Sequence, residues 1–553
     1  MKRLSIGLLL FAAMLPASAK SPLKFEISWA KPMDGHVVVV IANTNQREPR
    51  LQITEGLDSQ QMFGADVDNG RVVTIDGGAV GYPRATLDQV PAGEYYVQAV
   101  LNVYETFHRS DGHTVKLPMD YGEGQHWNRK PGNLYSEPVK VKIDPAASDV
   151  VKIELTKIIA PIEPPKDTKY IKHVKLQSKL LTAFWGRPMY VGAVVLLPEG
   201  FDSHPDAKYP VLYYQGHFSP SFSAGQFSET PDGGGGRGGR GGGASAGYRF
   251  FQDWTSGRLP RMLIVCTQDA NPYYDDSYAV NSANLGPYGD ALTQELYPYV
   301  EKEFRGIGEG WARAVYGGST GGWRAMALQV LHPDYFNGAW IACPDPIDFR
   351  AYSLVDIYAD KNAFWAPSAW KQVPIPMERT ADGKVLSMMD DAIRYELALG
   401  TKSRSGEQFD IWQAVYSPVG EDGYPQYIFD PQTGVIDHKV ADYWKERFDL
   451  NAILQRDWKT LGPKLIGKLH FAVGDNDSYY LDRAVRLTEK FLETTKDPGK
   501  GPFFAGEFDY GHLQPHGYSG DPKVPLNNRF MAAMLEWMLK TAPSGADVRS
   551  WRY

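Results

Sequence analysis

The stretch Ala314-Val-Tyr-Gly-Gly-Ser-Thr-Gly-Gly-Trp323 decides the fold class of this chain of 553 residues. It holds the pattern Gly-x-Ser-x-Gly around Ser319, directly after a short apolar run and directly before the helix-like run 323–331. A serine at such a strand–turn–helix junction is raised above the edge of a sheet, and the next backbone N–H, that of Thr320, faces the developing oxyanion. A turn this tight needs neighbours without side chains, and four glycines surround the serine: Gly317, Gly318, Gly321 and Gly322.

A serine hydroxyl needs a histidine base and a carboxylate that orients the base, and with this elbow the expected chain order is Ser, acid, His. The apolar run 469–473 leads into Gly474-Asp-Asn-Asp-Ser-Tyr-Tyr480, which places two carboxylates just past a strand end. Asp477 lies deeper in this loop and is the preferred acid. Asp475 is the alternative.

Only two histidines follow these carboxylates, so the base is His512 or His516. His512 is closer to the end of the strand-like run 503–508, whereas the flexible surroundings of Pro515 and Gly517 allow His516. The residues themselves leave this choice open.

A second oxyanion donor is expected upstream, where Tyr213-Tyr-Gln-Gly-His-Phe218 follows another apolar run. The backbone N–H of His217 or Phe218 is suitably placed on such a turn.

From about residue 169 to 553, short apolar strands alternate with helical segments, which indicates an α/β fold with a doubly wound, mostly parallel sheet. The segment 290–304 has helical periodicity, with Pro298 predicting a kink or a new first turn. The aromatic-rich segment of about 350–460 is too long for an ordinary connection and is expected to form a cap. The Gly-rich stretch 231–247 is expected to be a mobile loop.

Residues 20–160 have a period of two, with short runs of alternating apolar residues bounded by turn residues. This pattern predicts an N-terminal antiparallel β-sandwich, similar to an immunoglobulin domain. The Pro-rich segment 161–168 reads as a stiff linker between this domain and the catalytic one.

Residues 1–19 are typical of a bacterial secretory signal, with two basic residues, an apolar stretch and Ala17-Ser-Ala19 before the expected cleavage point. A periplasmic or secreted protein is therefore expected. Cys266 and Cys343 each lie in an apolar strand-like run, which favours two buried free thiols.

The composition excludes several classes of function. A formal net charge of −7 lacks the surplus of basic residues that a nucleic-acid partner requires. No stretch is long and apolar enough to predict a membrane span. We find no cluster of histidines and carboxylates at ligand spacing, so neither a metal nor an organic cofactor is expected.

These features resemble the esterase D-like family of the α/β-hydrolase superfamily, which includes feruloyl and enterochelin esterases. The resemblance covers about residues 170–553 and rests on segments 214–218, 286–292, 317–323 and 474–480 and on the segment with two histidines. The family's catalytic histidine is followed two positions later by an aromatic residue. His516-Gly-Tyr518 is similar to this pattern, so the resemblance implies His516 as the base, although Tyr518 stands where the family usually has Trp.

The sequence therefore predicts a serine esterase that acts on small-molecule or saccharide esters, including phenolic or carbohydrate esters, through an acyl-serine intermediate. The predicted residues are Ser319, Asp477 and His516, with the N–H groups of Thr320 and His217 as oxyanion donors. Two alternatives remain: a serine peptidase of the prolyl-oligopeptidase type and a non-catalytic carbohydrate-binding protein on a hydrolase scaffold. Comparison of acyl esters with peptide anilides separates the first, and failure to react with any acyl probe favours the second.

Overall fold

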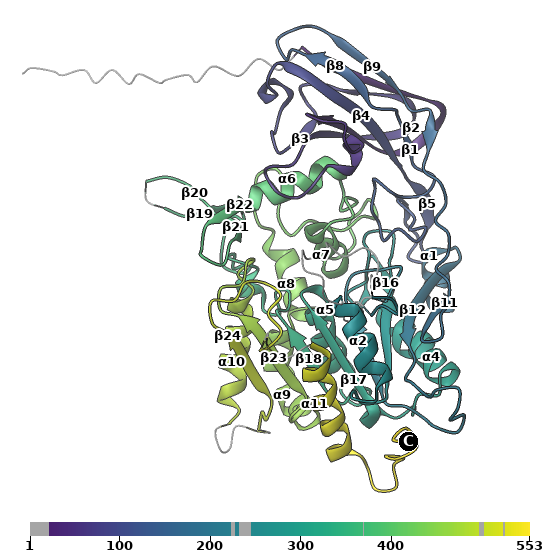
Figure 1. Ribbon diagram of the computed structural model, residues 1–553. Helices are drawn as coiled ribbons and strands as arrows, with labels where there is room; N and C mark the ends of the chain where they lie inside the picture. Colours follow the sequence, from purple (N-terminus) through teal and green to yellow (C-terminus); the bar gives the residue numbers. More distant parts are fainter. Residues whose placement is uncertain are drawn as a thin grey trace, which may run out of the picture.

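The computed structural model describes residues 22–222, 227–231, 245–368, 370–496, 501, 503–521, 523 and 526–553. Two sheets dominate it, and Figure 1 shows the N-terminal strands at one end of the molecule and the α/β sheet at the other. The predicted signal segment 1–19 and most of the Gly-rich stretch 231–247 lie outside the described residues.

The catalytic half is built on a sheet of eight strands. In spatial order these are β11 (Ile171–Ser178), β12 (Met189–Leu196), β14 (Leu263–Gln268), β13 (Val211–Gln215), β17 (Arg313–Gly318), β18 (Ala339–Ala342), β23 (Leu469–Gly474) and β24 (Glu507–Gly511). The pairs β11–β12 and β12–β14 are antiparallel and all the others are parallel. The carboxyl ends of the parallel strands therefore meet at one edge, as the expected doubly wound sheet requires.

The helices of this half are α1 (Lys179–Trp185), α2 (Ala246–Thr255), α3 (Tyr288–Asp290), α4 (Tyr297–Glu303), α5 (Thr320–Leu331), α9 (Leu450–Leu465), α10 (Asp482–Thr494) and α11 (Leu526–Thr541). The segment predicted as one kinked helix is α3, a π-helical turn at Ala291–Leu296 and α4, whose first turn contains Pro298. Proline fits there because a first-turn N–H lacks an intrahelical partner. The small pair β15 (Asn281–Ser282) and β16 (Gly286–Pro287) precedes this segment.

The N-terminal sheet contains β1 (Lys24–Ala42), β2 (Gln61–Ile75), β3 (Val80–Tyr82), β4 (Gly93–Val103), β7 (Leu134–Tyr135), β8 (Val139–Ile143), β9 (Val150–Glu154) and β10 (Lys157–Ile158). Its pairings are antiparallel except that of β1 with β9, which is parallel. The long strand β1 shifts register between Ser28 and Gly35, and this irregularity lets it pair with β9 along its first half and with β4 along its second. The purely antiparallel pattern predicted from sequence is therefore wrong at this one pair.

The N-terminal region is not confined to its own core. The hairpin of β5 (Glu105–His108) and β6 (Thr114–Leu117) inserts Phe107, Val115 and Leu117 into the large core of the catalytic half. These buried apolar side chains fix the two halves against each other.

The segment between β18 and β23 includes the residues that the sequence predicts to form a cap. It consists of β19 (Trp365–Ala366), β20 (Val373–Pro374), β21 (Pro376–Arg379), β22 (Val385–Met388), α6 (Met389–Leu399), α7 (Gln408–Tyr416) and α8 (His438–Arg447). Helix α9, most of which falls within the segment expected to form the cap, packs against α8 and also against α5 and α10 of the sheet's helical layer. Its apolar stripe is partly buried there, and aromatic composition alone does not indicate that packing.

Helix α6 lies between the N-terminal sheet and the catalytic half (Figure 1). Tyr395, Ala398 and Leu399 of α6 share a buried cluster with strands β1 to β4. Gly64 of β2 comes so close that a Cβ there would lie 2.0 Å from the carbonyl oxygen of Ala398. The cap is therefore held between two domains, with packed surfaces on both sides.

Three smaller expectations can be compared with the fold. The bounds of the predicted strand 503–508 are wrong, since β24 begins at Glu507 and Phe504 is buried in the segment before it. Cys266 and Cys343 are buried and form no disulfide, as predicted. No helix within the described ranges is long and apolar enough to cross a membrane.

Candidate active site

Ser319 is the single residue between the end of β17 and the start of α5. Its backbone has φ 57° and ψ −125°, a region that side-chain-bearing residues rarely adopt. The Ser319 N–H donates to the carbonyl of Ala342 at 3.0 Å, and its own carbonyl accepts the N–H of Gly322 at 2.8 Å. This strained turn directs the side chain away from the sheet while the backbone stays hydrogen-bonded.

Three of the four predicted glycines are required by close backbone contacts. A Cβ would lie 2.1 Å from the Gly321 oxygen at Gly317, 2.2 Å from the Gln215 oxygen at Gly321, and 2.5 Å from the Ala342 oxygen at Gly322. Gly318 differs, because no atom would lie nearer than 3.8 Å to a Cβ there. Only the tertiary structure separates this position from the others.

Three predicted residues meet at the carboxyl edge of the sheet. His516 Nε2 lies 2.9 Å from Ser319 Oγ, and His516 Nδ1 lies 2.8 Å from Asp477 Oδ2. An ionised carboxylate only accepts hydrogen bonds, so Nδ1 carries the proton and Nε2 is free to accept the serine proton. The arrangement forms a continuous path from hydroxyl to buried acid.

The acid is fully buried and held by backbone donors. Asp477 is 0% exposed, and its Oδ1 accepts the N–H of Tyr479 at 2.9 Å. Desolvation lowers the pKa of His516, but the hydrogen bond and charge of Asp477 outweigh it, so the pKa is raised overall. The buried carboxylate thus favours the imidazolium that forms when His516 takes a proton.

The alternative acid and base form a separate surface pair. His512 Nδ1 lies 3.1 Å from Asp475 Oδ2, and the His512 side chain is 84% exposed. Asp475 also accepts the N–H of Leu513 at 2.6 Å. This pair supports the loop that carries His516 and does not contact Ser319.

The predicted oxyanion donors border the elbow. The N–H of Thr320 is the first of α5, and neither it nor the N–H of His217 has a hydrogen-bond partner among the described residues. Arg324 Nη1 donates to the carbonyl of Gly216 at 3.0 Å and so holds the turn that carries His217. Both groups therefore remain available to an oxygen beside Ser319.

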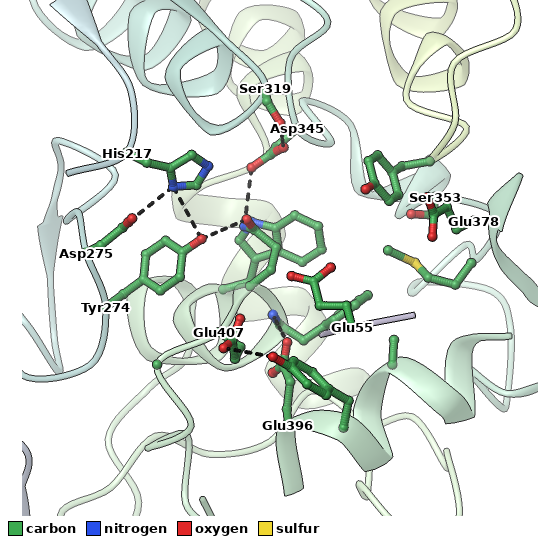
Figure 2. Close-up of a pocket in the computed structure, with 18 of the residues that line it drawn as sticks. Glu55, His217, Tyr274, Asp275, Ser319, Asp345, Ser353, Glu378, Glu396 and Glu407 are labelled. Atoms are coloured by element: carbon green, nitrogen blue, oxygen red, sulfur yellow. Dashed lines mark hydrogen bonds and ion pairs between the residues drawn. The ribbon is translucent and has the colours of Figure 1, made fainter. Parts of the chain in front are cut away.

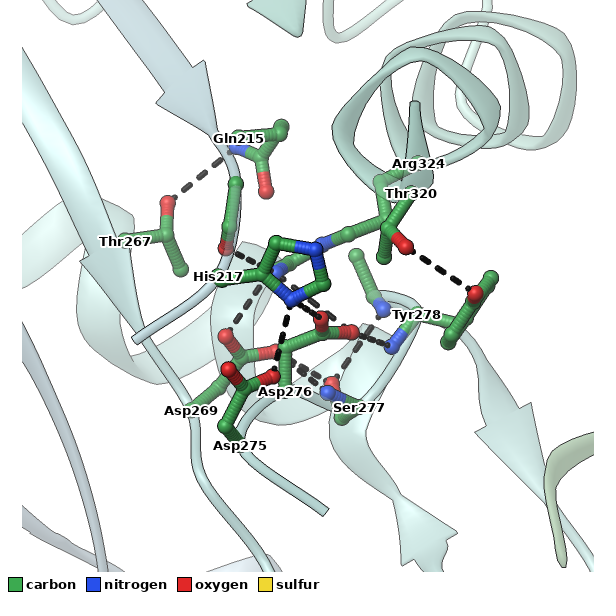
Figure 3. A network of polar contacts seen from close by, with 12 residues as sticks. Gln215, His217, Thr267, Asp269, Asp275, Asp276, Ser277, Tyr278, Thr320 and Arg324 are labelled. Atoms are coloured by element: carbon green, nitrogen blue, oxygen red, sulfur yellow. Dashed lines mark hydrogen bonds and ion pairs between the residues drawn. The ribbon is translucent and has the colours of Figure 1, made fainter. Parts of the chain in front are cut away.

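Beneath that turn lies a buried network of charges that the sequence did not predict (Figure 3). Arg324, which is fully buried, lies 2.7 Å from Asp269 Oδ1 and 3.6 Å from Asp276 Oδ1. His217 Nδ1 lies 3.2 Å from Asp275 Oδ1. Desolvation lowers the pKa of His217, but Asp275 and then Asp276 outweigh it and raise the pKa to about 9.

Part of this network is a group of potential metal ligands, in contrast to the sequence expectation that no such cluster exists. Ligand atoms of His217, Asp275 and Asp276 lie within 4.8 Å of one another. The three come from two loops that are separated by about fifty-five residues of sequence, so linear spacing could not reveal them. Arg324 supplies positive charge to Asp276, and the His217 imidazole, when protonated, supplies it to Asp275.

Asp345 is a further acid that the sequence analysis missed. It is 4% exposed, and its Oδ1 lies 3.4 Å from Ser319 Oγ. Its Oδ2 accepts hydrogen bonds from Tyr278 at 2.6 Å and Thr320 Oγ1 at 3.0 Å. Desolvation raises the pKa of this carboxyl. Asp345 follows the end of β18, so the strand-end rule that found Asp477 could also have found it.

Ser319 and His516 open into a cavity of about 370 Å³. Glu55 and His126 of the N-terminal region line it together with Glu378 and Glu407 of the cap (Figure 2 labels three of these four). The N-terminal domain, to which the sequence assigned no role, thus contributes residues to the lining of the candidate active site.

A serine on an elbow after the fifth strand of such a sheet, with an acid and a histidine after the seventh and eighth strands, defines a serine hydrolase of the α/β-hydrolase class. Residues 246–407, which include Ser319, match the family model described as "Putative esterase". The segment around Ser319 therefore matches an esterase family model, and the family resemblance seen in the sequence is confirmed for these residues.

Three of the solved structures that match this chain illustrate the low sequence identity of the similarity. A ferulic acid esterase is 17% identical, with 67% of this chain and 97% of that chain covered and a TM-score of 0.33. An S-formylglutathione hydrolase from Agrobacterium tumefaciens is 13% identical, with coverages of 68% and 97% and a TM-score of 0.33. The ferulic acid esterase AmCE1/Fae1A from Anaeromyces mucronatus is 14% identical, with coverages of 64% and 89% and a TM-score of 0.27. At these values the similarities transfer no activity to this chain. No curated protein matches its sequence.

Proposed function

We propose that the protein hydrolyses carboxylic esters through an acyl-serine intermediate. Ser319 Oγ bonds to the ester carbonyl carbon while its proton passes to His516 Nε2, and the leaving alkoxide then takes that proton. Water repeats the sequence on the acyl-serine, releases the acid and restores the serine. Asp477 holds the imidazole in the tautomer that this exchange needs.

The negative oxygen of each tetrahedral intermediate would lie between the N–H groups of Thr320 and His217. Such donors, fixed before the reaction begins, stabilise the transition state by about 3 kcal/mol each. The buried Arg324 supports this arrangement, because its hydrogen bond to Gly216 fixes the second donor's turn.

The observation that carries the proposal is the pair of short contacts of His516, 2.9 Å to Ser319 and 2.8 Å to Asp477. A fluorophosphonate probe tests it, with labelling followed in wild type, Ser319→Ala and the surface control Ser550→Ala. Labelling of wild type and the control but not of Ser319→Ala is expected. Equal labelling of Ser319→Ala would show that another residue is the nucleophile.

The acyl and alcohol groups also belong to the proposal. The cavity is lined by four aromatic residues, which supports phenolic or carbohydrate esters: Tyr274, Tyr395, Trp412 and Tyr479. A panel of short alkyl, feruloyl and acetyl-sugar esters ranks these groups, with peptide anilides as the test for peptidase activity. The signal-like segment 1–19 supports export, which fractionation of producing cells would test.

A further inference from the structure

The cavity that contains Ser319 is lined by an unusual excess of acids. Six carboxylates face it, and the described lining residues include neither lysine nor arginine: Glu55, Asp275, Asp345, Glu378, Glu396 and Glu407. A neutral or anionic substrate would gain nothing from this charge and would lose hydration in entering it.

Three of the six have structural partners. Asp275 pairs with His217, and Asp345 accepts hydrogen bonds from Tyr278 and Thr320. Glu396 accepts the N–H groups of Phe409 and Asp410, each at 2.7 Å. These contacts account for the three acids as parts of the fold.

The other three acids, Glu55, Glu378 and Glu407, have no ion-pair partner in the described part of the chain. Glu407 accepts one hydrogen bond, from the Tyr395 hydroxyl at 3.3 Å. Figure 2 shows Glu55, Glu378 and Glu407 spaced around the cavity away from Ser319. They come from three segments, the N-terminal domain, β21 and the start of α7, so the tertiary fold alone brings them together.

The same three acids lie where two cavities meet. Glu55, Glu378 and Glu407 also line a neighbouring cavity of about 950 Å³ that does not contain Ser319. A substrate that enters from this larger cavity must pass them before its ester reaches the nucleophile.

Their crowding is unfavourable without a cation. Desolvation and then the charge of Glu378 raise the pKa of Glu55. Desolvation and then the charge of Glu55 raise the pKa of Glu407 well above its ordinary value. A positive ligand group would remove this repulsion, and the aromatic rings of Tyr395 and Tyr479 beside the acids would also attract it.

An independent observation is a buried polar group in this cavity that lacks a hydrogen-bond partner. Ser353 lines it and is 1% exposed, and its hydroxyl has no hydrogen-bond partner in the described structure. A buried hydroxyl without a partner is costly, and a ligand atom would satisfy it.

We propose that the substrates are esters that carry an ammonium group, which Glu55, Glu378 and Glu407 hold while the ester carbonyl lies at Ser319. This rests on the proposed esterase function, because it names the substrate class of the same site.

Matched esters test the proposal. Butanoylcholine and 3,3-dimethylbutyl butanoate differ by a quaternary nitrogen in place of a carbon, and p-nitrophenyl 6-aminohexanoate and heptanoate provide the same comparison on the acyl side. We expect kcat/KM to be at least tenfold higher for the cationic member of one pair. Glu378→Gln and Glu407→Gln should each remove most of that preference, whereas the distant Glu493→Gln should leave it unchanged. Equal rates within both pairs would overturn the proposal and leave the esterase function standing.

Binding without turnover separates the two hypotheses. Calorimetry with Ser319→Ala should show tenfold tighter binding of the preferred cationic ester than of its neutral partner, weakened by salt and by Glu407→Gln. Equal binding of both partners would overturn the ammonium site. Selective binding of the cation, together with wild type that neither hydrolyses any ester nor reacts with fluorophosphonate, would support the ammonium site and overturn the catalytic proposal.

Discussion

His516 Nδ1 lies 2.8 Å from the Oδ2 atom of Asp477, whose carboxylate is fully buried. The two residues are thirty-nine positions apart but follow neighbouring parallel strands, β23 and β24, so their loops emerge at the same edge of the sheet. This contact sets both the tautomer and the basicity of the proposed base.

The pH dependence of activity should report this contact. Because the pKa of His516 is raised above its ordinary value of 6.5, kcat/KM should fall as the pH drops through a midpoint above 6.5. In Asp477→Asn the charge that raises the pKa of His516 is lost while desolvation remains, so the midpoint should move to lower pH. The same substitution should lower kcat about a thousandfold or more. Profiles of both proteins with one ester are the measurement, and an unchanged midpoint would exclude Asp477 as the partner.

The surface pair of Asp475 and His512 provides the matching control. Asp475→Asn and His512→Ala alter an exposed ion pair whose contribution to stability is about 1 kcal/mol or less. We expect kcat/KM within a few-fold of wild type for both variants. A loss of activity as large as that of His516→Ala would assign the base to His512.

The glycines around Ser319 should differ in how well they tolerate substitution by alanine. Gly317→Ala and Gly321→Ala would force a Cβ to within about 2 Å of backbone oxygens, so folded, labelled protein should be lost. Gly318→Ala, where no atom lies nearer than 3.8 Å, should remain folded and react with the fluorophosphonate probe. Thermal unfolding and labelling check both outcomes, and equal tolerance at 317 and 318 would contradict the close packing.

The docking of the N-terminal domain on the cap should depend on Asp66. Its carboxylate contacts His36 at 2.7 Å and the buried Arg404 at 2.8 Å. Asp66→Asn removes a charge-assisted contact, so the free energy of unfolding should fall by about 2 kcal/mol. Because Glu55 and His126 reach the cavity from the same domain, kcat/KM should fall as well. The exposed Asp144→Asn is the control, and thermal unfolding with ester kinetics checks both effects.

Local chemistry explains how much of the site could be predicted from the sequence. Ser319 carries its signature in adjacent residues, because an elbow needs small neighbours, a strand before it and a helix after it. Asp477 follows the apolar strand β23, and His516 lies in the loop after β24, whose bounds the sequence misplaced, so the order of elements was enough to list both residues. The choice between His512 and His516 needed the family resemblance, since both lie in one loop and local sequence does not encode which ring faces Ser319.

The rest of the site was decided by tertiary structure alone. Glu55, Glu378 and Glu407 come from three segments that share no local pattern, and each reads in sequence as an ordinary surface acid. They become a common lining only because the N-terminal sheet packs on α6 and the cap packs on the catalytic core. The sequence by itself identified the serine and limited the acid and the base to two candidates each, because strand-end geometry is local. The charge of the cavity depends on long-range packing, so it cannot be inferred from any single segment of the sequence.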